Sequence, residues 1–285
     1  MLRSQNRSYA SPPDETPRGF EGNGLHVHRR WSRHYKPFGN RVSEIRTVAV
    51  LGAGTMGHGI AQVSAMIGCL VRLFDANNSA TSAGIDKIRD NLDKGIARGK
   101  LTKDVRDRTL ENITTTGSIS EAVTGVDLVV EAAPEAIDIK ESIFAEVESV
   151  VPDHAILATN TSSLSIDQIS SSLRSPSRFV GMHFFNPVHI MALVEVVWGP
   201  QTSDATLEAA VQFAQRLGKE PIVVRDAPGF ASSRLGIALG MEAIRMVEQG
   251  VASPEDIDKA MELGYRHPMG PLKLTDLVRL DVRLR

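Results

Sequence analysis

A glycine-rich turn between two short apolar segments constrains the fold of this chain more than any other feature. The segment Thr47–Leu51 is followed by Gly52-Ala53-Gly54-Thr55-Met56-Gly57 and a helix-forming stretch, and a second apolar segment, Leu70–Phe74, ends in Asp75. Short β-rich segments bounded by glycine indicate buried parallel strands. We therefore expect a strand–turn–helix–strand unit that binds a dinucleotide at its turn.

Each glycine of this turn has its own predicted role. Gly52 allows the tight turn, Gly54 lets the backbone approach a pyrophosphate, and Gly57 lets the helix pack close to the strand. The backbone N–H groups at the helix start, with the helix dipole, favour an anion there. The candidate cofactor-binding residues of the turn are Gly52, Gly54, Thr55, Met56 and Gly57.

Asp75 is expected to select the cofactor. A carboxylate at this separation from the turn accepts hydrogen bonds from the ribose hydroxyls and repels a 2′-phosphate, which favours NAD over NADP. Arg72, on the same strand, is the nearby cation that would favour a phosphate instead.

The composition excludes several function classes. With 285 residues, the chain can hold one large and one smaller domain, and its net charge of −2 gives no reason to invoke nucleic acid or a membrane surface. No apolar segment approaches the roughly 20 residues of a membrane helix. The single cysteine, Cys69, predicts a small core residue in a reducing compartment, so we expect a cytoplasmic protein.

Residues 1 to about 45 differ from the rest of the chain. They are rich in Arg, Ser, Pro, Gly and His and poor in aliphatic residues, so we expect a disordered tail. Its Arg and Ser content would suit a transit segment to the mitochondrial matrix, although its acidic residues argue against one. His26, His28 and His34 have no fold to hold a metal ion, and no metal site is expected.

Strands alternate with helices along the next part of the chain. Further strands are expected at 113–116, 127–132, 155–159, 179–182, 193–197 and 220–224, with helices at 137–150 and 205–217. Ser165-Ile166-Asp167-Gln168 resembles a capping box that opens another helix. Beyond them the pattern is helical, at 232–249, 253–264 and 272–280. This order predicts an α/β fold: a Rossmann-type doubly wound sheet over residues 46–226, followed by a smaller, truncated all-helical domain over residues 227–285.

The helix after Asp75 has one apolar and one basic face. Isoleucine and leucine recur at three- and four-residue spacing from Ile85 to Ile96, while Lys94 and Arg98 lie on other faces. This basic face is either simply solvated or a surface for a phosphate-bearing substrate.

Polar residues follow two of the expected strands. Glu135 follows the strand at 127–132, with Lys140 in the next helix, and Asn160 and Ser162 follow the strand at 155–159. Ligands of open α/β sheets bind at the carboxyl ends of strands, so Glu135, Asn160 and Ser162 are site candidates unless they serve turn structure alone.

Glu195 is unusual because it interrupts the apolar segment 193–197. A buried carboxylate must be paired or protonated, and His183, twelve residues earlier, is the natural partner. A histidine beside a carboxylate is a common general-base arrangement. The alternatives are a purely structural pair or a glutamate on an exposed strand face.

The chain from about residue 46 to residue 285 resembles the L-3-hydroxyacyl-CoA dehydrogenase family, and most of all its bacterial 3-hydroxybutyryl-CoA dehydrogenases. Six stretches in the family's order carry the resemblance: Gly52 to Gly57, Asn160-Thr161-Ser162-Ser163-Leu164, Gly181-Met182-His183-Phe184-Phe185-Asn186-Pro187, Leu193-Val194-Glu195-Val196, Asp226-Ala227-Pro228-Gly229-Phe230 and His267-Pro268-Met269-Gly270-Pro271.

This resemblance implies reversible, NAD-dependent oxidation of a short-chain (S)-3-hydroxyacyl-CoA to the 3-oxoacyl-CoA, within fatty acid β-oxidation, by a homodimer. It implies that His183 is the catalytic base, that Glu195 orients it, and that Asn186 and Ser162 contact the substrate's 3-oxygen and the nicotinamide side of the cofactor. Further implied cofactor contacts are Asp75, Glu135, Lys140 and Asn160, and further implied substrate contacts are Ser233, Lys94 and Arg98.

The chain also departs from the family. Ser233 stands where the family has asparagine, and Arg266 and Arg279 stand where it has glycine. The helical domain is also shorter than the family's. Two alternatives therefore stay open: a dehydrogenase of a free hydroxy acid such as L-gulonate, and a truncated NAD-binding remnant without turnover.

Overall fold

The structure is a computed structural model and describes residues 44–278. Nearly all of the predicted disordered tail therefore lies outside the described residues, as do His26, His28, His34 and Arg279.

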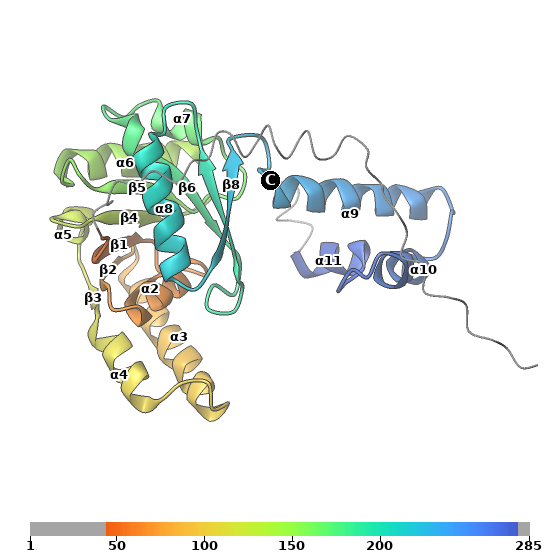
Figure 1. The fold of residues 1–285 in the computed structure, drawn as a ribbon, viewed down its shortest axis with the longest axis horizontal. Coiled ribbons are helices and arrows are strands. Elements are labelled where there is room, and N and C mark those ends of the chain that lie inside the picture. The colour runs from red at the N-terminus through yellow and green to blue at the C-terminus, as the bar shows by residue number, and fades with distance from the viewer. Residues whose placement is uncertain (1–43, 279–285) are drawn as a thin grey trace, which may run out of the picture. The chain divides into compact units, whose positions relative to one another are not determined.

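An eight-stranded sheet forms the centre of the described chain, in the spatial order β3-β2-β1-β4-β5-β6-β7-β8 (Figure 1). The strands from β3 to β6 in this order are parallel, β7 is antiparallel to β6, and β8 is parallel to β7. Their bounds are β1 Thr47–Leu51, β2 Leu70–Phe74, β3 Ile113–Thr115, β4 Leu128–Glu131, β5 Ile156–Thr159, β6 Phe179–Phe184, β7 Leu193–Trp198 and β8 Glu220–Arg225.

Helices cover both faces of this sheet. Those before the last strand are α2 Gly57–Met66, α3 Asn78–Ala97, α4 Lys103–Glu111, α5 Ile119–Val123, α6 Ile137–Val150, α7 Ile166–Ser170 and α8 Asp204–Arg216, with a 3-10 turn at Pro176–Arg178. One apolar core joins the sheet to α2, α3 and α8, and a second joins its other face to α5, α6 and α7. The Rossmann-type doubly wound fold is thereby confirmed.

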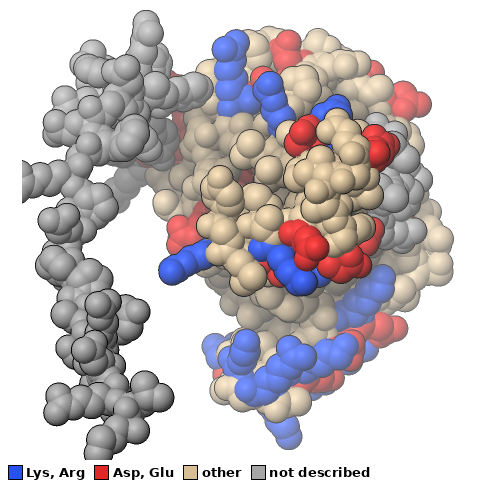
Figure 2. Space-filling view, turned by 90° about the vertical axis from the view of Figure 1, so that its right-hand side faces the viewer, with Lys and Arg blue, Asp and Glu red and all other residues tan. Residues whose placement is uncertain are grey.

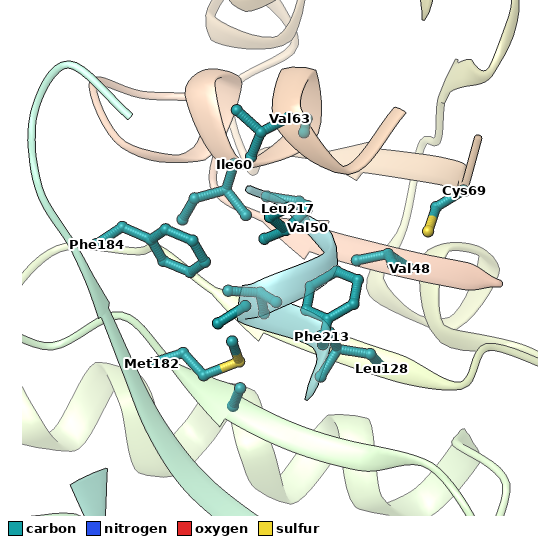
Figure 3. Packing of buried hydrophobic residues seen from close by; sticks show 14 of the residues in the cluster. Val48, Val50, Ile60, Val63, Cys69, Leu128, Met182, Phe184, Phe213 and Leu217 are labelled. Carbon is teal, nitrogen blue, oxygen red and sulfur yellow. The ribbon is translucent and has the colours of Figure 1, made fainter. Parts of the chain in front are cut away.

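Period-two alternation divides each central strand between the two cores. In β1, Val48 and Val50 belong to the core under α2 and α8, and Ala49 and Leu51 to the other. Figure 3 shows part of the first core, with Cys69 among its labelled residues. The expected buried, unpaired thiol is confirmed, and burial raises the pKa of Cys69.

Two helices were not expected from the sequence. Thr109 is the one buried residue of α4, so this helix lacks the apolar stripe that would have revealed it. The five residues of α5 are too few to show a period. Strand β6 also extends past its expected end at residue 182 through His183 and Phe184, both of which are buried.

The helices after β8 are α9 Ser232–Glu248, α10 Pro254–Lys259, a π-helical turn at Ala260–Gly264, and α11 Pro271–Val278. The single helix expected at 253–264 is thus two elements. The carboxylate of Asp258 accepts from the backbone N–H groups of Leu272 and Lys273, at 2.8 and 3.2 Å, and so ties α10 to the start of α11. Within residues 44–278, no helix has the length and apolar character needed to cross a membrane.

Candidate active site

The glycine turn after β1 has the geometry that each of its glycines predicts. Gly52 has φ +106°, a conformation that favours glycine, and a Cβ on Gly57 would lie 1.7 Å from the carbonyl oxygen of Gly52. By contrast, a Cβ on Gly54 would meet nothing within 4 Å. The turn is therefore closed on the side of the helix and open at Gly54, where a pyrophosphate is expected.

The polar groups around this turn fit a dinucleotide. The residue before α2, Met56, makes no side-chain hydrogen bond to the helix N-terminus, where the helix dipole favours an anion. Asp75 accepts from the backbone N–H of Ala53 at 2.8 Å and therefore lies beside the turn. Arg72 instead donates to the carbonyl oxygens of Glu121 and Thr124 at α5, so its cation is engaged there.

His183 and Glu195 are direct partners across the antiparallel strands β6 and β7. Nδ1 of His183 lies 2.7 Å from Oε2 of Glu195, and the two side chains are 9% and 0% exposed. Because an ionised carboxylate can only accept, Nδ1 carries the proton and Nε2 is left free to accept one.

Glu195 is also bound by the start of α9. Its Oε1 accepts from the N–H groups of Ala231 and Ser232, at 3.2 and 2.8 Å, and its Oε2 accepts from the Ser232 hydroxyl at 2.8 Å. Burial opposes ionisation, but the hydrogen bonds from His183 and Ser232 outweigh it and hold the pKa of Glu195 below its ordinary value. The carboxylate is therefore ionised at neutral pH.

Two aromatic rings lie beside the imidazole. The ring centroids of Phe185 and Phe230 lie 4.4 and 6.1 Å from that of His183. Phe230 is buried and has φ +50°, which is strained for a residue with a side chain. The chain between β8 and α9 thus brings an apolar ring against the histidine.

A buried ion pair organises the carboxyl ends of β4 and β5. Glu131, which is fully buried, accepts from Nζ of Lys140 at 2.7 Å, from the hydroxyl of Thr159 at 2.5 Å and from the N–H of Ala133 at 2.6 Å. Nζ of Lys140 also lies 3.3 Å from Oε2 of Glu135. Lys140 is therefore held between two carboxylates rather than extended into solvent.

Glu135 connects this ion pair to the chain after β5. It accepts from the hydroxyl of Thr161 at 2.6 Å and from the N–H of Ser162 at 2.8 Å. Burial opposes its ionisation, but these hydrogen bonds and the charge of Lys140 hold the pKa of Glu135 below its ordinary value. The hydroxyl of Ser233, at the start of α9, lies 3.3 Å from the carbonyl oxygen of Ser162.

The two candidate asparagines lie on either side of the end of β6. Oδ1 of Asn160 accepts from the N–H of Phe184 at 2.9 Å, which joins the end of β5 to β6. Asn186 is exposed and follows His183 by three residues. The structure therefore brings His183, Glu195, Ser162, Ser233 and the two asparagines to one edge of the sheet.

Lys219, which the sequence did not single out, holds the loop after Asn186. Its buried ammonium donates to the carbonyl oxygens of Val188 and Met191, the second at 2.8 Å. Burial lowers the pKa of Lys219. Val188 packs against α2, where a Cβ on Gly59 would lie 2.8 Å from it. The loop is thus fixed between α2 and β8.

Lys94 and Arg98 lie at the far end of α3, where Lys94 pairs with Asp90 at 2.6 Å. Figure 2 shows Lys and Arg gathered over α3 and α4 with acidic residues among them. No hydrogen bond joins either residue to the site at the sheet edge within residues 44–278, so their predicted contact with a substrate stays a prediction.

Three buried or half-buried residues of the site, Glu131, Lys219 and Ser232, were missed by sequence reasoning. Glu131 ends an apolar strand just as Glu195 interrupts one, and this signal could have identified it. Nothing in the local pattern distinguishes Lys219 or Ser232, because their partners lie far away in the sequence.

Comparison with known proteins identifies the family of the chain. Residues 47–227 match the model of the 3-hydroxyacyl-CoA dehydrogenase NAD binding domain, and residues 229–285 that of the 3-hydroxyacyl-CoA dehydrogenase C-terminal domain. The chain therefore belongs to the 3-hydroxyacyl-CoA dehydrogenase family, whose members are NAD-dependent oxidoreductases.

Individual relatives are similar over most of this chain. A probable 3-hydroxybutyryl-CoA dehydrogenase of Bacillus subtilis is 42% identical over 85% of this chain and 84% of its own length. The 3-hydroxyadipyl-CoA dehydrogenase of Escherichia coli is 42% identical over 84% of this chain, which spans half of that protein. The crystal structure of (S)-3-hydroxybutyryl-CoA dehydrogenase from Ralstonia eutropha superposes with a TM-score of 0.82, at 42% identity and 85% coverage of each chain.

Proposed function

We propose that this protein catalyses the reversible, NAD-dependent oxidation of a short-chain (S)-3-hydroxyacyl-CoA, such as 3-hydroxybutyryl-CoA, to the 3-oxoacyl-CoA. The observation that carries the proposal is the buried 2.7 Å contact between His183 and Glu195 at the sheet edge that also carries the glycine turn. The names of the relatives supply the substrate class.

His183 is the general base of the proposed reaction. Its Nε2 takes the proton of the 3-hydroxyl group, and the ionised Glu195 stabilises the imidazolium that results. In the reverse direction the imidazolium returns the proton to the carbonyl oxygen. Ser162 and Asn186 are proposed to donate hydrogen bonds to that oxygen, where negative charge develops.

NAD, when bound, supplies the acceptor for the hydride. The open space at Gly54 and the uncapped start of α2 support binding of its pyrophosphate there, and Asp75 is proposed to bind the adenosine ribose. We propose that Glu135, Lys140 and Asn160 form the nicotinamide side of the site, since they are linked through Glu131 and the chain after β5.

Residues 227–285 are proposed to be part of a helical domain that contacts substrate and forms a homodimer. Ser233 lies beside Ser162 and supports the substrate contact, although its hydroxyl reaches less far than the asparagine amide of the family. Lys94 and Arg98 are proposed to contact the phosphates of coenzyme A.

The direct assay follows NADH absorbance with acetoacetyl-CoA as substrate and NADPH as the control cofactor. We expect turnover with NADH and little with NADPH. Turnover of free hydroxy acids in place of CoA thioesters would contradict the substrate class. Binding of NADH without any turnover would contradict the proposed activity and favour a non-catalytic NAD-binding protein.

His183→Gln is expected to lower kcat by about 10²- to 10⁴-fold, the usual contribution of a general base, while NADH binding is unchanged. Stopped-flow or steady-state rates and a fluorescence titration with NADH measure the two effects. His154→Gln, which changes an exposed histidine away from the site, is the matched control and should keep full activity. A His183→Gln enzyme within a few-fold of the wild-type rate would overturn the proposed mechanism.

A further inference from the structure

Ser232 contacts Glu195 in a way that the proposed mechanism does not use. Its hydroxyl lies 2.8 Å from Oε2, the oxygen that also lies 2.7 Å from Nδ1 of His183. Its backbone N–H donates to Oε1 at 2.8 Å. Two side-chain donors, the imidazole and the hydroxyl, therefore share one carboxylate oxygen.

We propose that Ser232 is a positioning residue that acts through Glu195 and lowers the affinity of the His183–Glu195 pair for its catalytic proton. The inference rests on the proposed function, since it concerns the base of that reaction. A hydrogen bond from the hydroxyl stabilises the negative charge on Oε2 of Glu195. The carboxylate then stabilises the His183 imidazolium less strongly. The pair then takes up its proton at a lower pH than it would without the hydroxyl.

The surroundings leave few other groups that could set this affinity. The sheet register, the hydrogen bonds and the ring contacts place five residues against the pair: Ile222 of β8, Ala231 and Ser232 at α9, and Phe185 and Phe230. None of these five residues has an ionisable side chain. Among these five residues, Ser232 alone has a polar side chain. No other side chain among them can therefore replace its hydrogen bond to Glu195.

The effect of the hydroxyl can be separated from that of the backbone. The start of α9 is held on Glu195 by the N–H groups of Ala231 and Ser232, which any residue at position 232 other than proline retains. Replacing the side chain therefore removes one hydrogen bond to Oε2 and leaves the two to Oε1.

The test compares Ser232→Thr with Ser232→Val, two side chains of nearly the same shape of which only threonine keeps the hydroxyl. The measurement is the pH profile of kcat/KM for oxidation of (S)-3-hydroxybutyryl-CoA by NAD. We expect Ser232→Thr to keep the wild-type midpoint of the acidic limb. Ser232→Val should raise this midpoint by about 0.5 pH unit, which lowers kcat/KM about threefold at pH values below the midpoint.

A second measurement does not require turnover. Imidazole NMR signals of His183, assigned by their loss in His183→Gln, give the protonation midpoint of the pair in the free enzyme, and Ser232→Val should raise it while Ser232→Thr does not. Ser253→Ala removes the hydroxyl that caps α10, far along the chain from this pair, and should lower the melting temperature without moving either midpoint.

The results distinguish this inference from the proposed function. Absence of turnover in the wild type overturns the proposed function, and the NMR titration still decides the role of Ser232. Equal midpoints in the Val and Thr variants, or a lower midpoint in the Val variant, overturn the inference while leaving the dehydrogenase activity intact.

Discussion

Glu195 shows how a carboxylate can stay ionised in the interior of a protein. A buried charge costs several kcal/mol unless hydrogen bonds replace the water it loses. Here each carboxylate oxygen accepts two hydrogen bonds. Oε1 accepts from two backbone N–H groups, and Oε2 accepts from one hydroxyl and one imidazole. Because the N–H groups belong to the start of α9, the helix dipole also favours the negative charge. The residue that orients His183 is thus also the anchor of α9.

Substitution of Gly57 by alanine should lower the stability of the fold, whereas substitution of Gly54 should weaken NADH binding. Gly57→Ala places a methyl group 1.7 Å from a backbone oxygen that cannot move without breaking the turn, so we expect a loss of about 3 kcal/mol of stability. Gly54→Ala meets nothing within 4 Å, so the fold should keep its stability. Its methyl group would occupy the space proposed for the pyrophosphate, and NADH should bind at least about tenfold more weakly.

Chemical denaturation and a fluorescence titration with NADH measure these two effects, and each variant is the control for the other. If Gly54→Ala bound NADH as the wild type does, the pyrophosphate could not lie at this turn.

At the scale of elements, buried carboxylates connect helices and loops that the sequence separates. Glu148, near the end of α6, accepts from the N–H groups of Arg174 and Ser175 in the segment before β6, at 2.8 and 2.9 Å. Burial opposes its ionisation, but these bonds and the charges of Arg178 and Arg174 hold the pKa of Glu148 below its ordinary value. The position of β6, and with it His183, depends in part on this anchor.

Glu148→Gln should lower the free energy of unfolding by about 2 kcal/mol at pH 7, because an amide cannot replace two hydrogen bonds to an ionised group. A carboxylate whose pKa is depressed by folding stabilises the protein above its unfolded pKa, and this stabilisation is lost as the pH falls through the folded value. The difference in the free energy of unfolding between Glu148→Gln and the wild type should therefore become smaller as the pH is lowered below about 4.

Urea unfolding at a series of pH values measures this difference, with the exposed Glu146→Gln on the same helix as control. A difference that stayed constant with pH would contradict the assigned role of the charge.

At the scale of the whole molecule, the helices after β8 differ from the sheet region in burial. Leu235 and Leu239 on α9 are 65% and 42% exposed, and Leu277 on α11 is 68% exposed. Large apolar side chains exposed on neighbouring helices are typical of a surface that binds another molecule. Together with the proposed homodimer, this favours a second copy of the chain as the covering molecule.

Leu235→Glu combined with Leu277→Glu should weaken self-association by about 2 kcal/mol or more, roughly 30-fold in Kd, because a charge replaces apolar surface at the interface. Sedimentation velocity over a range of concentrations measures this shift. Leu70→Glu, at a leucine that is 59% exposed on β2, is the control and should leave association unchanged. A wild-type protein that sediments as a monomer at all concentrations would contradict the proposed interface.

Features that depend on neighbouring residues could be predicted from the sequence. The bounds of α6 follow from a local apolar pattern, and the cap of α7 by Ser165 from a single side chain. The roles of Gly52 and Gly57 follow from local backbone geometry. The doubly wound fold class and the acid at the end of β2 could be predicted for the same reason, because strand periodicity and turn chemistry act over a few residues.

The contacts between residues that are distant in the sequence depend on the three-dimensional packing of the chain. It set β7 antiparallel to β6, so that Glu195 lies opposite His183, and it brought the start of α9 onto the same carboxylate. It turned Arg72 toward α5 and placed Lys219 under the loop after Asn186. These contacts join residues 12 to 52 positions apart, beyond the reach of any periodic pattern. They form because a buried charge or donor needs a partner, and the packing of the sheet and helices determines which partner is close enough.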